Sequence, residues 1–264
     1  MILDLQLEDK RAVVTGGSRG IGLAIASALL AEGARVAVVA RSESGIESAV
    51  NKLGAGSRVA GVAADTTSRG QVESMVRQVT ERFGGIDILV NGAAQRAGGK
   101  PERSLLQGFD EGSLRSDLDT KVFGYLRCAY AVAPMMVARG WGRIINIGGV
   151  GARRTGQIST SVRNVSVAAI TKNLADDLGP RGINVTAVHP GLTHIPFRQG
   201  DSVEPDEQAQ HLLAERVANE VSIGRMITAA EVADVVVFLA SPRSVAIHGD
   251  AILVAGGMQK VIYY

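Results

Sequence analysis

A glycine-rich segment near the start of the chain is the clearest candidate for a ligand-binding site. It reads Thr15-Gly16-Gly17-Ser18-Arg19-Gly20-Ile21-Gly22 and lies between an apolar run of strand length and a helical pattern. Glycines at 16, 20 and 22 permit a tight turn and close approach of a pyrophosphate to the backbone, while the helix start offers N–H groups to phosphate. The pattern predicts a dinucleotide site, the alternative being an ordinary strand–helix turn. The expected contacts are Gly16, Ser18, Arg19, Gly20, Ile21 and Gly22.

The end of the next expected strand distinguishes NAD from NADP. An NAD site usually places Asp or Glu about 20 residues after the turn, where it binds the ribose 2′-hydroxyl. This sequence has Ala40-Arg41-Ser42 there, without an acidic residue. A carboxylate would repel a 2′-phosphate, whereas the guanidinium of Arg41 can bind it in a bidentate manner. We therefore expect NADP(H) rather than NAD, with Arg41 and Ser42 at the extra phosphate; the alternative is that Arg41 and Arg19 are merely solvated.

Two further segments end neighbouring strands and are expected to line the same crevice. Asp65-Thr66 follows the third strand, where the adenine edge would lie. Asn91-Gly92-Ala93-Ala94 ends the fourth strand, where small residues let the backbone approach a ribose. No metal site is expected, because the four histidines are scattered and Cys128 is the only cysteine.

The elements that must position these residues alternate between short apolar strands and longer helical patterns. This alternation predicts an α/β fold of the Rossmann type, a doubly wound parallel sheet of about seven strands with helices on both faces. Residues 1–264 are interpreted as a single domain, with a polar substrate lid at about 195–225. Strands are expected at 11–15, 35–40, 58–63, 87–91, 143–147, 183–189 and 251–254, and helices at 20–32, 43–53, 68–83, 112–138, 158–179, 205–219 and 229–240.

Composition limits the class of partner. The formal net charge is +2 with no long run of one sign, which disfavours nucleic acid and an anionic membrane surface as partners. No apolar run approaches the roughly 18 residues of a membrane span, and no signal-peptide pattern precedes the first strand. With one cysteine, no intrachain disulfide can form. We expect a cytoplasmic protein that acts on a small molecule.

Together these motifs resemble the short-chain dehydrogenase/reductase family over essentially the whole chain. The resemblance implies the strand order 3-2-1-4-5-6-7 and NAD(P)-linked oxidation or reduction of alcohols and carbonyls. It also implies a homodimer or homotetramer joined through the helices at 112–138 and 158–179, and cofactor contacts from Pro190, Gly191 and Thr193. It rests on the turn at 15–22, Asp65, the segment at 91–94, the strand at 143–147, Asn184-Val185, Pro190-Gly191, the helix at 229–240 and Gly256-Gly257.

The resemblance breaks at the catalytic residues. The family uses Asn, Ser, Tyr and Lys, the last two spaced Tyr-x-x-x-Lys. The tyrosine and lysine positions follow from counting back from Thr171-Lys172-Asn173-Leu174, the serine position from the strand end at 146–149, and the asparagine position from the segment at 118–124. All four hold other residue types, and none of the four tyrosines is followed four residues later by lysine. The replacements are Lys121 for Asn, Gly149 for Ser, Thr160 for Tyr and Asn164 for Lys.

Lys121 and Thr160 are the candidates for the missing proton donor. In the family, a lysine ammonium lowers the tyrosine pKa from about 10 so that the phenol can exchange a proton near neutrality. The hydroxyl of Thr160 does not titrate there, although it can donate a hydrogen bond. A partly desolvated Lys121 could supply a proton or stabilise an oxyanion, or the side chain could snorkel to solvent.

Two functions follow from this pattern. The first is an NADP(H)-dependent oxidoreductase with a non-standard catalytic centre, acting on a carbonyl, enone or alcohol. Loss of a general acid removes about 10²–10⁴ in rate, so electron-poor substrates such as enones and quinones would react most easily. The alternative is a non-catalytic NADP(H)-binding sensor or an inactive partner subunit.

Overall fold

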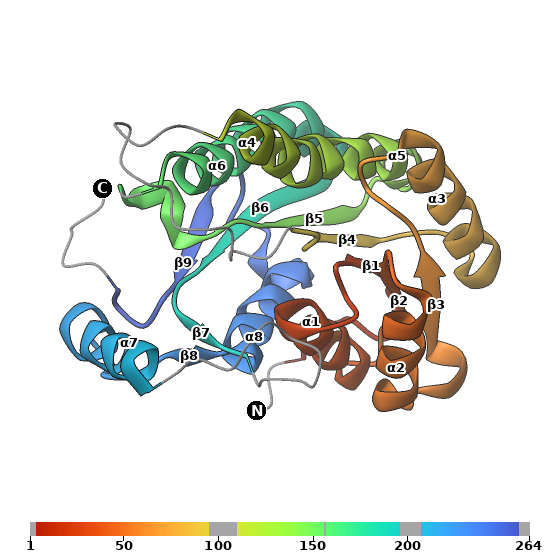
Figure 1. Ribbon diagram of the computed structural model, residues 1–264. Coiled ribbons are helices and arrows are strands. Elements are labelled where there is room, and N and C mark those ends of the chain that lie inside the picture. Colours follow the sequence, from red (N-terminus) through yellow and green to blue (C-terminus); the bar gives the residue numbers. More distant parts are fainter. Residues whose placement is uncertain (1–3, 95–109, 156, 196–206, 259–264) are drawn as a thin grey trace.

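A parallel sheet runs through the middle of the molecule (Figure 1). The computed structural model describes residues 4–94, 110–155, 157–195 and 207–258. The strands of this sheet are β1 (Arg11–Thr15), β2 (Arg35–Ala40), β3 (Val59–Ala63), β4 (Ile88–Asn91), β5 (Gly142–Ile147), β6 (Ile183–Pro190) and β9 (Ala251–Val254). Their order is β3-β2-β1-β4-β5-β6-β9. The predicted order is confirmed, β9 being the strand expected as the seventh.

Helices cover both faces of the sheet, as Figure 1 shows. Neighbouring strand residues point to opposite faces, so Val14 belongs to one apolar layer and Val13 to the other. The first layer packs against α1 (Gly20–Ala31), α2 (Glu43–Leu53) and α8 (Ala229–Ala240). The second packs against α3 (Arg69–Phe83), α5 (Gly124–Arg139) and α6 (Ile158–Leu178). Two aliphatic layers thus fix the strand ends from which the site residues project.

Two features depart from the expected element list. The helix expected at 112–138 is α4 (Glu111–Leu118), a π-helical segment η3 (Asp119–Phe123) and then α5. A second, two-stranded parallel sheet joins β7 (Thr193–His194) to β8 (Ile227–Thr228). Of the expected lid, 196–206 lie outside the described residues, and α7 (Glu207–Glu220) forms most of the remainder.

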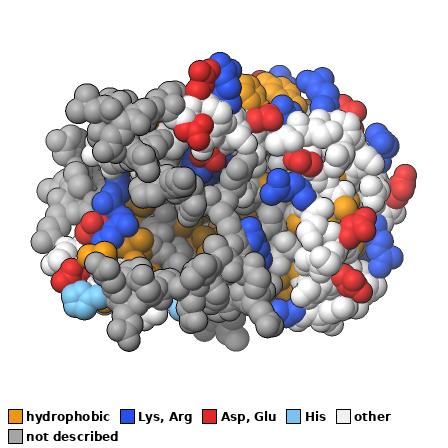
Figure 2. All heavy atoms as spheres, viewed as in Figure 1, with side chains coloured by type: hydrophobic (Ala, Val, Ile, Leu, Met, Phe, Trp, Pro, Cys, Tyr) orange, Lys and Arg blue, Asp and Glu red, His pale blue; other side chains and the backbone are white. Residues whose placement is uncertain are grey.

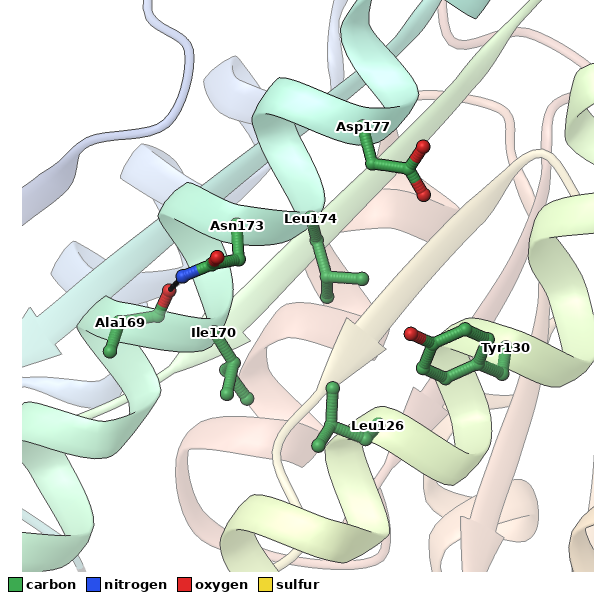
Figure 3. A pocket seen from close by; sticks show the side chains of 7 residues that line it. All are labelled: Leu126, Tyr130, Ala169, Ile170, Asn173, Leu174 and Asp177. Atoms are coloured by element: carbon green, nitrogen blue, oxygen red, sulfur yellow. Dashed lines mark hydrogen bonds between the residues drawn. The ribbon is translucent and has the colours of Figure 1, made fainter.

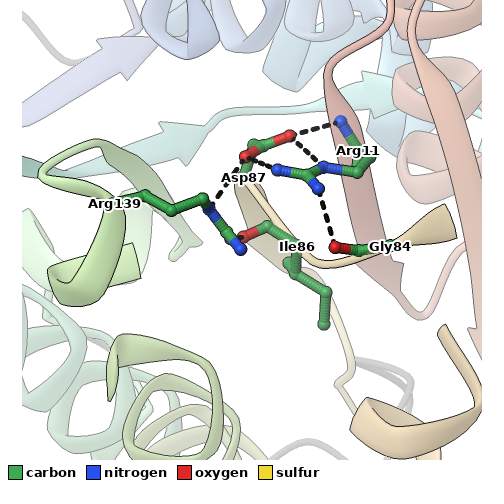
Figure 4. A network of polar contacts seen from close by, with 5 residues as sticks. All are labelled: Arg11, Gly84, Ile86, Asp87 and Arg139. Carbon is green, nitrogen blue, oxygen red and sulfur yellow. Dashed lines mark hydrogen bonds and ion pairs between the residues drawn. The ribbon is translucent and has the colours of Figure 1, made fainter. Parts of the chain in front are cut away.

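An ion-pair network ties the amino ends of β1 and β4 together (Figure 4). Arg11 donates to both carboxylate oxygens of Asp87 at 2.6 Å, and Arg139 from the end of α5 lies 3.6 Å from the same carboxylate. Burial by itself raises the pKa of Asp87, but the hydrogen bonds and charge of Arg11, with the charge of Arg139, outweigh it and hold that pKa below its usual value. The network lies at the opposite end of the strands from the ligand crevice expected at their carboxyl ends.

The described surface carries charges of both signs. Figure 2 shows Lys and Arg side chains interspersed with Asp and Glu over the described part of the face in view. Across the described ranges, the helices include none with the length and apolar character to cross a bilayer. Within those same ranges, no group of three or more His, Cys, Asp or Glu residues is arranged to hold a metal ion.

Candidate cofactor and active site

The turn between β1 and α1 contains backbone contacts that only glycine permits. Gly16 has φ +69°, and a Cβ there would lie 2.6 Å from the carbonyl oxygen of Gly92. A Cβ on Gly22 would lie 2.2 Å from the carbonyl oxygen of Gly16, and Gly20 has φ +54°. These glycines let the backbone of the turn fold closely on itself at the start of α1, and this backbone turn from Gly16 to Gly22 is called the cradle. This cradle fits a pyrophosphate docked at a helix N-terminus.

The residues between these glycines shape the mouth of the cradle. Arg19 is the N-cap of α1 and is exposed, while Ser18 and Ile21 are half-buried. The Ser18 hydroxyl lies 3.7 Å from where a Cβ on Gly45 would be, so the turn reaches the start of α2. The glycine-rich turn and the end of β2 thus border one another.

Arg41 stands at the end of β2 as the sequence predicts. Its side chain is exposed, and Ser42 beside it is the N-cap of α2. The pKa of Asp65 is lowered: burial opposes this, but hydrogen bonds from the Thr67 N–H (2.9 Å) and hydroxyl (2.8 Å) outweigh burial, helped by the Arg41 charge. Arg41 and Asp65 therefore lie close enough to interact at the edge of the crevice. A guanidinium here fits a 2′-phosphate.

The end of β4 presents backbone rather than side chains to the crevice. Thr15 accepts hydrogen bonds at its hydroxyl from the N–H groups of Gly92 (3.0 Å) and Ala93 (3.3 Å). The Asn91 side chain is fully buried and donates to the side-chain oxygen of Asn146 at 2.9 Å. Asn91 thus braces two strands, and the part of this segment that can approach a ribose is the Gly92–Ala93 backbone.

Thr66 is turned away from the open crevice. Its side chain is 5% exposed, and its hydroxyl lies 2.9 Å from where a Cβ on Gly124 would be. The residue therefore packs against the start of α5. Its expected contact with adenine stays a prediction, restricted to the backbone of this residue.

The chain leaving β6 crosses toward the glycine-rich turn. Pro190 ends the strand, and the N–H of Gly191 donates to Val254 of β9 at 2.9 Å. The Thr193 hydroxyl donates to the Gly191 carbonyl at 3.1 Å. This segment therefore lies along the carboxyl end of the sheet.

Ile195 follows β7 and approaches the start of α1. Its terminal methyl lies 3.3 Å from where a Cβ on Gly20 would be. An apolar side chain thus meets the start of α1 from across the crevice, beside the β7–β8 sheet. The hydroxyl nearest in sequence is that of Thr193.

The replaced catalytic positions meet at the carboxyl end of β5. The Asn164 carboxamide lies 3.2–3.5 Å from where a Cβ on Gly149 would be. Its nitrogen donates to the Thr160 carbonyl at 2.9 Å, while its buried oxygen has no hydrogen-bond partner among the described residues. The Thr160 hydroxyl donates to Gln157 at 2.9 Å. The site therefore holds a carboxamide at the position assigned from the sequence to the family's lysine.

Lys121 projects into the protein from the π-helical segment. Its side chain is 6% exposed, and Nζ donates to the carbonyl oxygen of Gly148 at 2.9 Å. Burial and, to a smaller extent, the charge of Arg163 lower the pKa of Lys121 to about 7, against the opposing charge of Asp117. The amine does not snorkel to solvent, and near neutrality it is divided between its charged and neutral forms.

Three features of the site have no counterpart in the sequence prediction. Arg163 is 7% exposed and pairs with Asp117 at 2.8 Å across 46 residues. His189 is 1% exposed and accepts the Gly149 N–H at Nδ1. A third feature is the π-helical segment itself. Each depends on contacts between distant elements, so no local pattern could have indicated them.

The helix α7 is tied to the loop after β5. Arg154 follows the short helix η4 (Val150–Arg153) and donates to both carboxylate oxygens of Glu220, at 2.8 and 3.3 Å. Hydrogen bonds from Arg154 lower the pKa of Glu220. Val217 and Val150 pack in the same apolar cluster. The described part of the expected lid therefore borders the catalytic positions.

Neither described tyrosine substitutes for the family's tyrosine. Tyr125 is 1% exposed and its hydroxyl donates to the Ile147 carbonyl at 2.9 Å. Burial raises the pKa of this phenol far above its ordinary value. Tyr130 is 68% exposed on α5. Tyr263 and Tyr264 lie outside the described residues.

Sequence comparison gives the family. A family model described as Enoyl-(Acyl carrier protein) reductase matches residues 16–259. The chain belongs to the short-chain dehydrogenase/reductase family. The 3-oxoacyl-[acyl-carrier-protein] reductase FabG of Vibrio cholerae is 35% identical over 97% of this chain and 100% of its own. The short-chain reductase protein NovJ of Streptomyces niveus is 36% identical over 95% of this chain and 94% of its own.

A solved structure of a related reductase superposes on this chain over nearly its full length. L-Sorbose reductase from Gluconobacter frateurii, crystallised with NADPH and L-sorbose, superposes with a TM-score of 0.88 at 30% identity. The match covers 98% of this chain and 100% of the reductase. The Rossmann-type fold and the family are thus established together.

Proposed function

We propose that this protein is an NADP(H)-dependent oxidoreductase that reduces a carbonyl or enone, or oxidises the corresponding alcohol, on a small molecule. The observation that carries the proposal is the cradle at Gly16 and Gly22, closed to side chains and bordered by Arg41. It is supported by the reductases that resemble this chain, one of them crystallised with NADPH. The bound nicotinamide supplies or receives the hydride.

The residues of this chain then have distinct roles. The N–H groups at the start of α1 bind the pyrophosphate, and Arg41 with Ser42 binds the 2′-phosphate. Backbone at Gly92 and Ala93 borders a ribose, and the segment after β6 borders the nicotinamide. The product oxygen receives either a proton from the ammonium form of Lys121 or a hydrogen bond from the Thr160 hydroxyl, in which case the proton comes from water.

The test follows NADPH absorbance with a panel of enones, quinones and ketones, with NADH in parallel. We expect turnover of an electron-poor member of the panel and a preference for NADPH. Lys121→Ala and Thr160→Ala then distinguish the donors, because the variant that removes the donor lowers kcat more than KM. Glu81→Ala, on the exposed face of α3 and away from the proposed site, is the matched control. Absence of turnover with the whole panel contradicts the proposal.

The alternative, a non-catalytic NADP(H) sensor or inactive partner subunit, is favoured by a specific observation. The hydroxyl of Thr160 is engaged by Gln157, and the amine of Lys121 by a backbone carbonyl. Neither group is poised toward an open site. Titration calorimetry distinguishes the two functions: tight NADPH binding without turnover, together with a copurifying chain, supports the alternative.

A homo-oligomer, as a dimer or tetramer, is part of the proposal. Side chains of α5 and α6 face each other across a surface groove (Figure 3), whose lining includes Leu126, Tyr130 and Ile170. Tyr130 is 68% exposed, and Val165 on α6 is 51% exposed. Apolar exposure of this kind is typical of interfaces. Light scattering on the purified protein should give twice or four times the mass of 27.5 kDa.

A further inference from the structure

The peptide group that joins Gly148 to Gly149 is held from both sides by buried titratable side chains. Nζ of Lys121 donates to the Gly148 carbonyl oxygen at 2.9 Å. The Gly149 N–H donates to Nδ1 of His189 at 3.0 Å. Lys121 is 6% exposed and His189 is 1% exposed. Because the two polar groups of a trans peptide point in opposite directions, the two side chains approach from opposite sides.

The rest of the backbone at these two glycines is also engaged. The Gly148 N–H donates to Val188 at 2.7 Å, and the Gly149 carbonyl accepts from the Ala152 N–H at 3.0 Å. All four backbone polar groups of Gly148 and Gly149 therefore have partners within the protein. The peptide is fixed in place and is not offered to a ligand.

Glycine is needed at position 148 to make room for the histidine ring. A Cβ on Gly148 would lie 2.0 Å from Nδ1 of His189. Neither Gly148 nor Gly149 lies in the left-handed region, the φ of Gly149 being extended at 175°. A Cβ on Gly149 would meet only the Asn164 carboxamide, at 3.2 Å or more. Glycine at 148 is therefore required mainly by the His189 ring. The Asn164 carboxamide lies next to Gly149, on the other residue of the same peptide group.

We propose that Lys121 and His189 are positioning residues that clamp the Gly148–Gly149 peptide and so keep Gly149 and Asn164 fixed in the active site. The proposal rests on the oxidoreductase function proposed above. In this role both side chains act through the backbone and need not touch the substrate. The clamp requires a lone pair on Nδ1, so neutral His189 carries its proton on Nε2.

The surroundings keep His189 in this neutral form. Burial, together with the charges of Lys121 and Arg153, lowers the pKa of His189 to about 4. The carboxylate of Asp250 lines the same cavity as Arg153 and His189. Below that pKa, protonation removes the acceptor and releases the Gly149 N–H. The clamp is therefore lost in acid.

The charge of Lys121 is set by two further elements. Arg163 of α6 faces it with like charge, and Asp117 of α4 with opposite charge. The amine retains N–H donors in both protonation states. Its hydrogen bond to Gly148 therefore persists on both sides of neutrality, and the acid sensitivity of the clamp comes from His189.

Two variants of His189 distinguish the effect of losing the hydrogen-bond acceptor from the effect of losing the ring. His189→Asn keeps an acceptor near the place of Nδ1, whereas His189→Leu removes it. We expect kcat about tenfold lower in His189→Leu with little change in the NADPH KM, and a change within about threefold in His189→Asn. In addition, the wild-type loss of kcat on acidification toward pH 4 should be absent in His189→Asn. Equal effects of the two variants overturn the proposal.

A matched control comes from a second histidine with the same kind of bond. Nδ1 of His248 accepts the Val185 N–H at 3.2 Å, far along β6 from the clamped peptide. His248→Leu should lower thermal stability without lowering kcat. A kcat loss equal to that of His189→Leu would mean that removing any such bond is sufficient, and would contradict the clamp.

Nitrogen-15 NMR of the histidine rings tests the clamp without requiring turnover. The His189 resonances, assigned with His189→Asn, should show protonated Nε2 and an unprotonated Nδ1 that persists well below the ordinary histidine pKa of about 6.5. Titration of His189 near that ordinary value, or a proton on Nδ1, overturns the clamp. Absence of NADPH turnover alongside the expected ring state would refute the proposed function and leave the clamp standing.

Discussion

Two glycine-containing turns at the carboxyl end of the sheet use the same residue for opposite purposes. In the turn from Gly16 to Gly22, absent side chains let backbone approach backbone, and the first N–H groups of α1 face the crevice. In the turn at Gly148 and Gly149, every backbone polar group is bonded within the protein. The first turn offers its backbone to a ligand, and the second has its backbone fixed by buried side chains.

The difference explains why one turn resembles the family closely and the other does not. A phosphate site made of backbone needs glycine at the positions where a Cβ would collide with the turn, and it needs no particular side chain there. A catalytic turn depends on the side chains around it, and here Lys121 and His189 support the turn where the family's serine would lie. Substitutions that act on backbone room and on side-chain charge should therefore affect the two turns differently.

The largest effect is expected from Gly22→Ala. The new Cβ would lie 2.2 Å from the Gly16 carbonyl oxygen, so the cradle must open. We expect NADPH affinity to fall on the order of 100-fold or more, measured by fluorescence titration, because displacement of the turn removes several phosphate contacts. Gly70→Ala is the control, since a Cβ there meets nothing within 4 Å. Retention of normal affinity in Gly22→Ala would show that the turn does not hold the cofactor.

Substitution of the two glycines in the second turn should lower the free energy of unfolding by different amounts. Gly148→Ala places a Cβ 2.0 Å from the His189 ring, whereas Gly149→Ala places one 3.2 Å from the Asn164 amide. We expect Gly148→Ala to lose about 1–3 kcal/mol of unfolding free energy through overpacking, and Gly149→Ala less than about 1 kcal/mol. Chemical denaturation of both variants measures this. The reverse order would mean that the ring does not occupy the space beside Gly148.

Removing the buried amine should stabilise the protein while impairing it. Lys121→Met leaves the Gly148 carbonyl without its donor, but it eliminates an ammonium whose folded-state pKa of about 7 lies well below the ordinary 10.5. Because 1 pKa unit corresponds to about 1.4 kcal/mol, the net gain at pH 7 should be about 2 kcal/mol after loss of the hydrogen bond.

The pH dependence of the stability gained in Lys121→Met tests whether burial of the charged amine is its cause. Between pH 7 and 10.5 the unfolded chain binds the proton that the folded amine releases. The wild type therefore gains stability as pH rises through this window, and the advantage of Lys121→Met, complete at or below pH 7, shrinks toward pH 10. Thermal melts across this range measure it. A constant difference would show that the amine is not destabilised by burial.

The smallest effect is expected from Arg41→Ala, which alters one contact of the cradle. Because Arg41 is exposed, loss of its ion pair with phosphate should cost about 1 kcal/mol, which weakens NADPH binding roughly fivefold and leaves NADH binding nearly unchanged. Titration with both cofactors measures the ratio, and Arg69→Ala, on the exposed start of α3, is the control. Equal weakening of both cofactors would place Arg41 away from the 2′-phosphate.

The sheet and the cradle were predictable because their signals are local. The apolar run at 11–15 and the glycines that follow it lie within a dozen residues, and the structure has β1 at Arg11–Thr15. The environment of Lys121 was not predictable, because the like charge that acts on it belongs to Arg163, 42 positions later in the chain. His189 likewise meets Gly149 across 40 residues of sequence. Contacts between residues so far apart produce no periodic pattern in the sequence.

The π-helical segment at Asp119–Phe123 has a consequence for how this region tolerates change in length. In an α-helix each residue turns the chain by about 100°, and a π-helical turn contains more residues than an α-helical one. The side chains of α5 are therefore rotated about the helix axis relative to those of α4. Deleting one residue within the segment would restore uniform winding and rotate Lys121 relative to one of the flanking helices. A shortened chain would thus change the direction of the amine while leaving the helix intact.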